Sequence, residues 1–572
     1  MMYDLVIRGA TLVDGLGNAP IQADVAVNDG LIAAIGAITE AATRTIDGSG
    51  LTVSPGIVDI HTHYDAQVTW DPTLSPSPSL GVTTAVMGNC GFGIAPSPPA
   101  ARERIVRNLS VVEGMDLDAL LTGIEWNFES FGEYMSALRK RAPYLNVGVL
   151  TGHSVIRTTV MGDEASTRSE ATDEEMATMK ALVADAMANG AIGFGSSYSM
   201  NHSGFGGVPM PSTITDLSEF DALVGAMGSH NNGVVQLASG PTTVAALEPV
   251  AAKHKRAIFK TTAAAMYNEE APERGMEVFK DCEAAQARGN AVYIQIPCQP
   301  LSFDFTMANA YPFFSHDGMS EVKAYTPEQL TETFKDSSFR DCFRESLTRP
   351  RPGLIFQGNW ERVVVAVPAL EKNAHLTGRR VSDIAAETGQ DPLDFMLDLS
   401  LEEDLQTTFI GHFLNVVDEG VAPLLKHDAG VVALSDAGAH LIFMCDAGFG
   451  LHFLAHWVRE LGEFSIEEGI RRLTSHPADL YGIPNRGRIE VGAHADLMLF
   501  DQATVGVTPA SRVADLPGGG LRTIRGSTGV HGVFVNGVEV FDGTQYVAMP
   551  KGPGQVLDRF NPSSGLKSAA AN

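Results

Sequence analysis

Short apolar segments alternate with helical segments through the middle of the chain, and this alternation is the feature that most constrains its fold. Apolar runs of about four to eight residues are typical of strands buried on both faces, as in a parallel sheet. The segments between them supply the crossovers, for example a predicted helix over 173–189 that ends at Gly190. About eight such strands predict an α/β fold closed into a (β/α)8 TIM-like barrel. The predicted strands are 57–60, 83–87, 146–150, 192–195, 234–237, 257–260, 291–296 and 431–434.

Both ends of the chain have the pattern of short antiparallel strands instead. Turn-rich sequences separate the early strands, and the pair Asn536–Gly537 predicts a tight hairpin turn between two of the late ones. Because a barrel begins and ends at neighbouring points, the two halves are predicted to form one small β-sandwich domain. The predicted strands are 3–8, 23–27 and 31–35, then 496–500, 529–535, 538–541 and 546–548.

These patterns divide the chain into a β domain made of 1–54 and 483–560 and a barrel over 55–482. The stretch at about 299–403 is too long for a barrel crossover, so we expect an insertion that acts as a lid. Its aromatic side chains line a pocket or form the core of the insertion itself. The tail, 561–572, is predicted to be disordered. The aromatic residues are Phe303, Phe305, Tyr311, Phe313 and Phe314.

Charge and cysteine usage limit the expected partners. The formal net charge is −28, which repels phosphates and anionic lipids, so we expect neither nucleic acid nor a membrane surface as a partner. No apolar run reaches the roughly 18 residues of a membrane span. Without a visible leader, and with five dispersed cysteines, the chain is expected in the cytoplasm. A small-molecule substrate is the expected partner, and a homo-oligomer is left open.

His61 and His63 are the clearest candidates for chemistry. They stand two residues apart after an apolar strand, so their imidazoles lie on one face and can bind one metal ion. The alternative is a pair of solvated histidines in a loop. Their position at the end of the first barrel strand favours the metal, because barrel active sites form at the C-terminal ends of strands.

Several longer motifs resemble those of a known family. The sequence VSPGIVDIHTHYD at 53–65, together with LTSHPADLYGI and NRGRIEVGAHADLMLFD near the other end, resembles the amidohydrolase superfamily. Within it, GNCGFGIAP, TGHSVIR and GAIGFGSS are most similar to the N-acyl-D-amino-acid deacylase (D-aminoacylase-like) branch. The resemblance covers the chain except for the insertion and the tail. It implies a metal-dependent hydrolase of carbon–nitrogen bonds other than peptide bonds.

The resemblance assigns roles to Cys90 and Asp436. It implies that Cys90 is a thiolate ligand, and sulfur suits zinc, although a lone buried cysteine can also be inert packing. Asp436, in VVALSDAGAH, matches the superfamily's last-strand aspartate beside the metal and the attacking water. A carboxylate there holds the metal and moves a proton from water to the leaving nitrogen. The alternative role for Asp436 is a helix cap.

Three further residues are candidates on the same basis. His153, in TGHSVIR, matches a segment at the end of the third strand, where it orients or polarises the scissile carbonyl. Arg157 in the same motif binds an acidic substrate group or forms a buried structural ion pair. His440 is a candidate neighbour of the substrate or a structural residue.

The fifth and sixth strands depart from the family pattern. The resemblance implies a further metal histidine on each, but these segments read GVVQLASG and AIFKTT. The remaining ligands, His61, His63, Asp436 and Cys90, suffice for one divalent ion, expected to be zinc. Lys260 on the sixth strand is a candidate carbamylated ligand, cation or substrate anchor, or a structural lysine.

These observations leave three functions open. The first is hydrolysis of an amide, of an N-acyl amino acid or a larger amide, by a metal-activated water. The second is hydrolysis of a cyclic amide, lactone or carbamate on the same fold. The third is a catalytically inactive scaffold, against which the retention of His61, His63 and Asp436 argues.

Overall fold

Eight parallel strands form the central sheet of the computed structural model, which describes residues 2–228, 233–314, 316–322, 325–349, 354–441 and 445–561. Their order, β16-β12-β11-β10-β9-β8-β7-β6, follows the chain from one edge to the other. Each overlaps one of the strands predicted from the sequence. The strands are β6 (Ile57–Asp59), β7 (Val82–Met87), β8 (Asn146–Gly152), β9 (Gly193–Ser197), β10 (Val234–Ala238), β11 (Ile258–Thr261), β12 (Val292–Ile296) and β16 (Gly430–Val432).

The sheet is curled so strongly that the segments after its two outer strands are neighbours. The His63 backbone N–H donates to the Ala437 carbonyl oxygen at 2.7 Å, and Thr62 and Ala437 form a parallel bridge. The Ser435 hydroxyl donates to the carbonyl oxygen of His61 at 3.1 Å. Residues that follow β6 and β16 are therefore held together at one end of the sheet.

Side chains along these strands alternate between the inside of the curled sheet and the helices around it. Phe259 and Tyr293 pack with Tyr481 in a cluster on the inside. Ile258 and Ile294, their neighbours in sequence, belong instead to the large cluster that includes the helices. This alternation decides which strand residues can reach a site inside the sheet.

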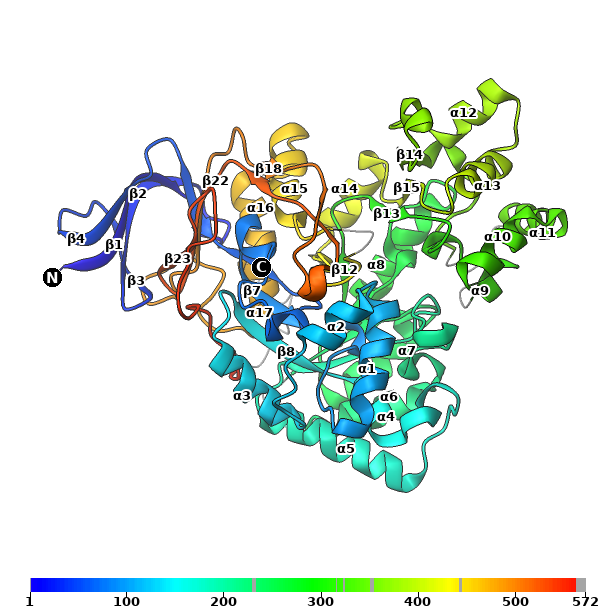
Figure 1. Cartoon of the computed structure of the whole chain (residues 1–572). Coiled ribbons are helices and arrows are strands. Elements are labelled where there is room, and N and C mark those ends of the chain that lie inside the picture. The colour runs from blue at the N-terminus through cyan, green and yellow to red at the C-terminus, as the bar shows by residue number, and fades with distance from the viewer. Residues whose placement is uncertain are drawn as a thin grey trace.

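Helices cover the outside of the sheet (Figure 1). The predicted helix over 173–189 is confirmed as α5, which begins with a capping box between Thr172 and Glu175. The helices are α1 (Pro99–Val112), α2 (Leu117–Gly123), α3 (Phe131–Arg141), α4 (His153–Met161), α5 (Asp173–Ala188), α6 (Leu217–Ala226), α7 (Val244–His254), α8 (Pro272–Ala287), α14 (Asp418–Lys426), α15 (Phe449–His452), α16 (Ile466–Leu473) and α17 (Ser475–Leu480).

A second sheet combines strands from both ends of the chain. Its order is β23-β22-β17-β5-β1-β2-β3, with β4 paired to β1. The strand β5 pairs with β17, which joins the two ends directly. Figure 1 shows this sheet on the opposite side of the molecule from the helices between α10 (Pro327–Lys335) and α13 (Pro392–Glu402). The strands are β1 (Tyr3–Leu12), β2 (Ile21–Asn28), β3 (Leu31–Gly36), β4 (Ala42–Asp47), β5 (Thr52–Pro55), β17 (Leu497–Phe500), β22 (Val530–Val535) and β23 (Val538–Phe541).

The long segment between β12 and β16 carries its own three-stranded sheet, of order β13-β15-β14. Its strand β15 lies beyond the predicted end of the insertion near residue 403, because this strand occupies the centre of the small sheet. We call this segment the insertion lobe, residues 301–414. Its elements are β13 (Leu301–Phe305), β14 (Val363–Val367), β15 (Thr408–Leu414), α9 (Met319–Val322), α10 (Pro327–Lys335), α11 (Ser337–Leu347), α12 (Val381–Thr388) and α13 (Pro392–Glu402).

Two remaining expectations concern membranes and the tail. Among the described ranges, no helix combines the length and apolar character needed to cross a bilayer. The predicted disordered tail lies outside the described residues apart from Asn561, whose N–H donates to the Gly482 carbonyl oxygen at 2.8 Å.

Candidate metal centre

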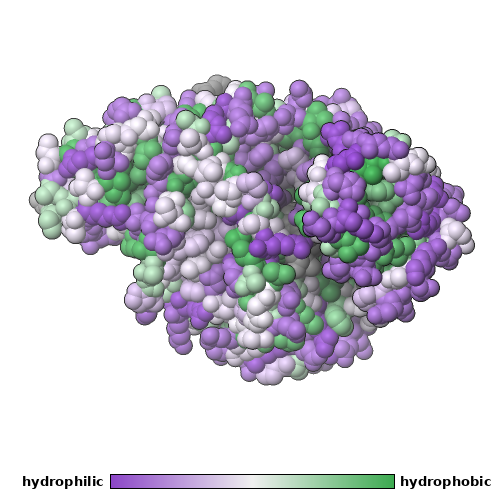
Figure 2. Space-filling model, turned by 45° about the horizontal axis from the view of Figure 1, so that its top comes forward, coloured by the Kyte–Doolittle hydropathy of each residue, from purple (hydrophilic) through white to green (hydrophobic). Residues whose placement is uncertain are grey.

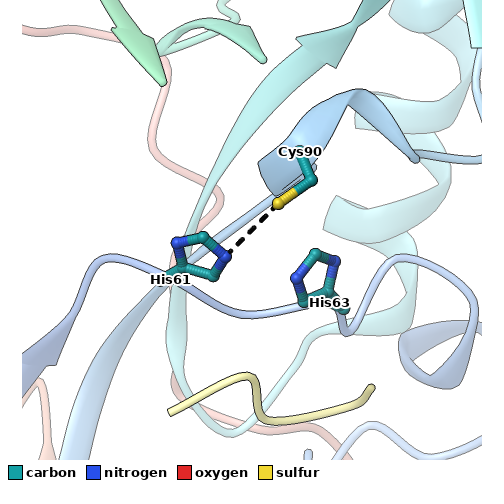
Figure 3. A group of neighbouring side chains, drawn as sticks. All are labelled: His61, His63 and Cys90. Carbon is teal, nitrogen blue, oxygen red and sulfur yellow. Dashed lines mark hydrogen bonds between the residues drawn. The ribbon is translucent and has the colours of Figure 1, made fainter. Parts of the chain in front are cut away.

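Four potential metal ligands converge at the C-terminal end of the curled sheet. His61 and His63 follow β6, Cys90 follows β7 and Asp436 follows β16. His61 Nε2 lies 3.2 Å from Asp436 Oδ1 and 3.6 Å from Cys90 Sγ. His63 Nε2 lies 3.5 Å from the same Asp436 oxygen. Figure 3 shows the two imidazole rings and the thiol gathered around one point.

These separations fit a single small ion. Zinc bonds of about 2.0–2.3 Å in a tetrahedral arrangement place neighbouring donor atoms about 3.3–3.7 Å apart. One donor atom from each of His61, His63 and Cys90 lies within 4.8 Å of the other two, and all three residues are buried. Two imidazoles, a thiolate and a carboxylate are ligands that zinc accepts. The donor set therefore fits zinc.

The backbone is strained at two of these ligands. The φ angle is 54° at Cys90 and 45° at Asp436, in the left-handed region that costs energy for residues with a side chain. Glycines allow the Cys90 turn to lie against the sheet, since a Cβ on Gly88 would stand 2.3 Å from the Leu150 carbonyl oxygen. The glycine-rich sequence around Cys90 is thus required by the position of its thiol.

His61 is held through its second ring nitrogen. Gln295 on β12 accepts hydrogen bonds through Oε1 from His61 Nδ1 at 2.8 Å and from the Thr261 hydroxyl at 2.7 Å, and donates to the Tyr481 hydroxyl at 3.0 Å. Because Nδ1 carries the proton, Nε2 keeps a lone pair for a metal. Burial lowers the pKa of His61 to about 4 against the opposing charge of Asp436, so the ring is neutral at physiological pH.

Glu113 belongs to the site although the sequence reasoning missed it. Its buried carboxylate follows α1, and Oε1 lies 3.0 Å from His63 Nδ1. Burial acts to lower the pKa of His63, but the Glu113 charge and hydrogen bonds to Asp436 and Cys90 outweigh it and raise that pKa well above its ordinary value. A single glutamate after a helix has no diagnostic spacing, so the sequence offered no signal for this contact.

Three more side chains border the same space. His440 donates its backbone N–H to the Glu113 carbonyl oxygen, and its ring centroid lies 6.3 Å from that of Tyr311 in the insertion lobe. Burial, with the charges of Asp436 and Glu113, raises the pKa of Tyr311. Burial lowers the pKa of His202, in the loop after β9, to about 4, and Glu113 opposes this shift. The insertion lobe therefore contributes a residue to the metal centre's surroundings, and His202 is a second neighbour that the sequence reasoning missed.

The structure does not bring His153 and Arg157 to the ligands. His153 Nε2 lies 2.8 Å from Glu219 and Nδ1 lies 2.9 Å from the Ser196 hydroxyl, so both ring nitrogens have partners. Arg157 Nη1 lies 2.6 Å from each oxygen of Glu219. Both side chains are 0% exposed. This arrangement is the structural ion pair that the sequence left open for Arg157.

Lys260 also lies away from the ligands. Its ammonium donates to the Thr242 carbonyl oxygen at 2.5 Å, and burial lowers its pKa to about 8 against the influence of Cys282 on α8. Its neighbours Phe259 and Thr261 face the inside of the sheet, so Lys260 faces the helices. Lys260 therefore has the contacts of a structural lysine and not those of a metal ligand.

The inside face of β10 and β11, the fifth and sixth strands, carries Gln236 and Thr261, and neither strand has the histidine that the resemblance implies. Gln236 Oε1 accepts the Cys90 backbone N–H at 2.6 Å, and its amide lies 3.5 Å from the Thr261 hydroxyl. Thr261 in turn contacts Gln295. Uncharged groups that bond to one another and to the ligand loop therefore fill the space beside the four donors.

The chain is similar to several known proteins along nearly its whole length. D-aminoacylase from Alcaligenes xylosoxydans xylosoxydans is 28% identical over 94% of this chain and 94% of its own length. N-acyl-D-aspartate deacylase from the same organism is 28% identical over 97% of this chain and 95% of its own. A solved structure of D-aminoacylase, described as having a binuclear metal centre with one-metal activation and second-metal attenuation, superposes with a TM-score of 0.67. It is 26% identical and covers 97% of this chain and 100% of its own. The model of the amidohydrolase family matches residues 44–541, so the chain belongs to the amidohydrolase family.

Proposed function

We propose that this chain hydrolyses the amide bond of N-acyl amino acids with one bound divalent ion, zinc by its ligand chemistry. The observation that carries the proposal is a set of three distances: His61 Nε2 lies 3.2 Å from Asp436 Oδ1 and 3.6 Å from Cys90 Sγ, and His63 Nε2 lies 3.5 Å from Asp436 Oδ1. The site lies at the C-terminal end of the curled sheet, where barrel enzymes place their chemistry. The proposal includes closure of this sheet as a TIM-like barrel and a β-sandwich built from both chain ends.

A single ion is favoured because the space beside the four donors lacks strong ligands. Gln236, Thr261 and Gln295 present amide and hydroxyl groups that hydrogen-bond to one another and to the ligands. Zinc prefers thiolate, imidazole and carboxylate over such groups. The solved D-aminoacylase is described as activated by one metal, which is compatible with this arrangement.

When bound, the ion supplies Lewis acidity that activates water and polarises the scissile carbonyl. The chain's own contribution to proton transfer comes from Asp436. Interactions with His61 and His63 overcome the effect of burial and lower the pKa of Asp436, so its carboxylate is ionised. Its side chain is 22% exposed, which leaves it accessible to water and substrate. We infer that Asp436 takes the proton of water and passes it to the departing nitrogen.

The proposed acyl group is apolar because an apolar surface borders the metal centre. Leu434, two residues before Asp436, packs with Met266, Leu414 and the partly buried Leu301. Phe303 and Tyr311 continue this surface into the insertion lobe. Of the predicted lid aromatics, Phe305, Phe313 and Phe314 pack in the lobe's own core instead. The lobe thus supports the proposed role of a lid through Leu301, Phe303, Tyr311 and Leu414.

Hydrolysis rates across a series of acyl chains test this function. N-acetyl, N-butanoyl and N-hexanoyl forms of D- and L-amino acids should show kcat/KM rising about fourfold for each added CH₂ that becomes buried. Met266→Gln should flatten this rise while leaving the N-acetyl rate near that of the native enzyme. If the metal-loaded enzyme cleaves none of these compounds but opens a cyclic amide or lactone, the proposed substrate class is wrong.

Glu113 is proposed to position His63 through the ion-pair contact with its Nδ1, in the way that Gln295 positions His61. Glu113→Gln should therefore weaken zinc binding by about 10–100-fold, the usual effect of losing a carboxylate behind a metal-bound histidine. Competition with a chromogenic chelator measures this affinity directly. Glu103→Gln, on the exposed surface of the same helix, is the matched control. An unchanged zinc affinity in Glu113→Gln would remove Glu113 from this role.

A further inference from the structure

A cavity of about 540 Å³ lies outside the set of metal ligands. It forms where the insertion lobe, the helical segment 449–460 and the C-terminal segment 504–528 meet, and we call it the interlobe cavity. Figure 2 shows a furrow between the insertion lobe and the rest of the molecule. The volume falls within the range of about 300–1,000 Å³ that is usual for small-ligand sites. The lining residues used below are Ser302, Asp304, His412, Asp446, Arg459 and Arg525.

One wall is the polar face of the lobe's small sheet. Ser302 pairs across the strands with His412, and both line the cavity together with Asp304. Phe303 and Phe305, which alternate with them on β13, pack in apolar clusters. Because side chains on a strand alternate between the two faces of a sheet, the polar side chains of β13 point toward the body of the protein. A ligand between the insertion lobe and the body can contact them there.

Charges of both signs line this cavity. Arg525 donates from Nε to the Cys445 carbonyl oxygen at 3.0 Å and from Nη1 to the Thr508 carbonyl oxygen at 3.4 Å. Within the part of the chain that the structure describes, no carboxylate lies within ion-pair distance of Arg525, and no cation lies within that distance of Asp304 or Asp446.

Both carboxylates carry a burial penalty as ions. Burial raises the pKa of Asp304 to about 6, against the opposing charges of Arg525 and Arg512, and that of Asp446 to about 7, against the charge of Arg525. An ammonium group brought beside them would offset this penalty. The guanidinium on the other wall is suited to a carboxylate, which it binds through two parallel hydrogen bonds.

We propose that the interlobe cavity binds the zwitterion of a free α-amino acid, with its carboxylate on Arg525 and its ammonium on Asp304 and Asp446. Hydrolysis of an N-acyl amino acid releases such a zwitterion, so the link to product rests on the proposed function. The binding itself requires no metal ligand.

Calorimetric titration of the full metal-loaded chain with D- and L-phenylalanine tests the proposal. One enantiomer or both should bind. The titration is repeated in a His61→Ala/His63→Ala variant, which cannot hold or hydrolyse substrate at the metal. Binding of phenylalanine should persist there, whereas N-acetylphenylalanine and phenethylamine, each lacking one charge, should bind to this variant at least 10-fold more weakly.

Two arginine variants locate the site. Arg525→Met should weaken phenylalanine binding at least 10-fold. Arg459→Met is the matched control, because Arg459 lines the same cavity but is paired with Glu460 and donates to the Val505 carbonyl oxygen. Its variant should bind as the native chain does, and melting curves establish that both variants are folded.

Three results would overturn the inference: equal binding of N-acetylphenylalanine, full binding in Arg525→Met, or loss of phenylalanine binding in the double histidine variant. Absence of amino acid binding in an enzyme that still cleaves N-acyl amino acids would reject the cavity and leave the proposed function standing. Amino acid binding by an enzyme that hydrolyses no N-acyl amino acid would reject the proposed function and leave the cavity proposal standing.

Discussion

Replacing Asp436 with asparagine is expected to lower turnover by about 10²–10⁴-fold, the usual contribution of a positioned acid–base group. Asparagine keeps the size of the side chain and an oxygen that faces His61 and His63, so most of the metal should remain bound. It removes the proton acceptor, because an amide is not basic near neutral pH. Steady-state kinetics and elemental analysis on the same preparation separate the two effects.

Asp163→Asn is the matched control, since Asp163 is an exposed carboxylate that pairs with Arg104 on α1 and is not a ligand. Its turnover should stay close to that of the native enzyme. A metal-loaded Asp436→Asn enzyme with near-native turnover would show that another group moves the proton. His440 and His202 border the site and would be the next residues to replace.

Replacing Glu219 with alanine is expected to lower the free energy of unfolding by about 3–5 kcal/mol. The substitution leaves Arg157 buried and charged without its carboxylate, and it also removes the partner of His153. Chemical denaturation measures the change. Glu103→Ala, which breaks an exposed pair with Arg107, should cost less than about 1 kcal/mol.

The double variant Arg157→Met/Glu219→Leu separates structure from function for this pair. Removing both charges together should recover most of the lost stability, because no unpaired ion then stays buried. A native-like stability of Glu219→Ala, combined with a large rise in KM, would return Arg157 to the role of substrate anchor.

Much of the fold could be predicted because the signals are local. Apolar runs and the helical segments between them identified all eight parallel strands, and the hairpin at Asn536–Gly537 is present between β22 and β23. The end of the insertion lobe was placed too early, near residue 403. Strand β15 belongs to that lobe only through its pairing with β13 and β14, which is a long-range contact.

The candidate site also contains residues that local motifs identified and a residue that only the folded structure reveals. His61, His63, Cys90 and Asp436 stand in motifs at strand ends, and the structure brings them together. Glu113 escaped notice because only the folded chain places it behind His63.

Two other residues, Lys260 and His153, differ from their predicted roles because of the direction of one side chain and the interaction partner of the other. Side chains on β11 point alternately to the two faces of the sheet, and Lys260 points toward α8. If the strand were shifted by one residue, Lys260 would point to the inside of the sheet instead. His153 follows the end of a strand as predicted. Its Nε2, however, interacts with Glu219 on α6, a helix that lies far from His153 in sequence. Contacts of that kind carry no local signal.

Metal content is the measurement that tests the central claim most directly. Protein purified without chelator should contain about one zinc per chain, and the His61→Ala/His63→Ala variant, shown to be folded by circular dichroism, should contain almost none. Amide hydrolysis should disappear with the metal and return when zinc is added to the native chain. Full zinc occupancy in the folded double variant, or hydrolysis by the metal-free native enzyme, would contradict the assignment of this site.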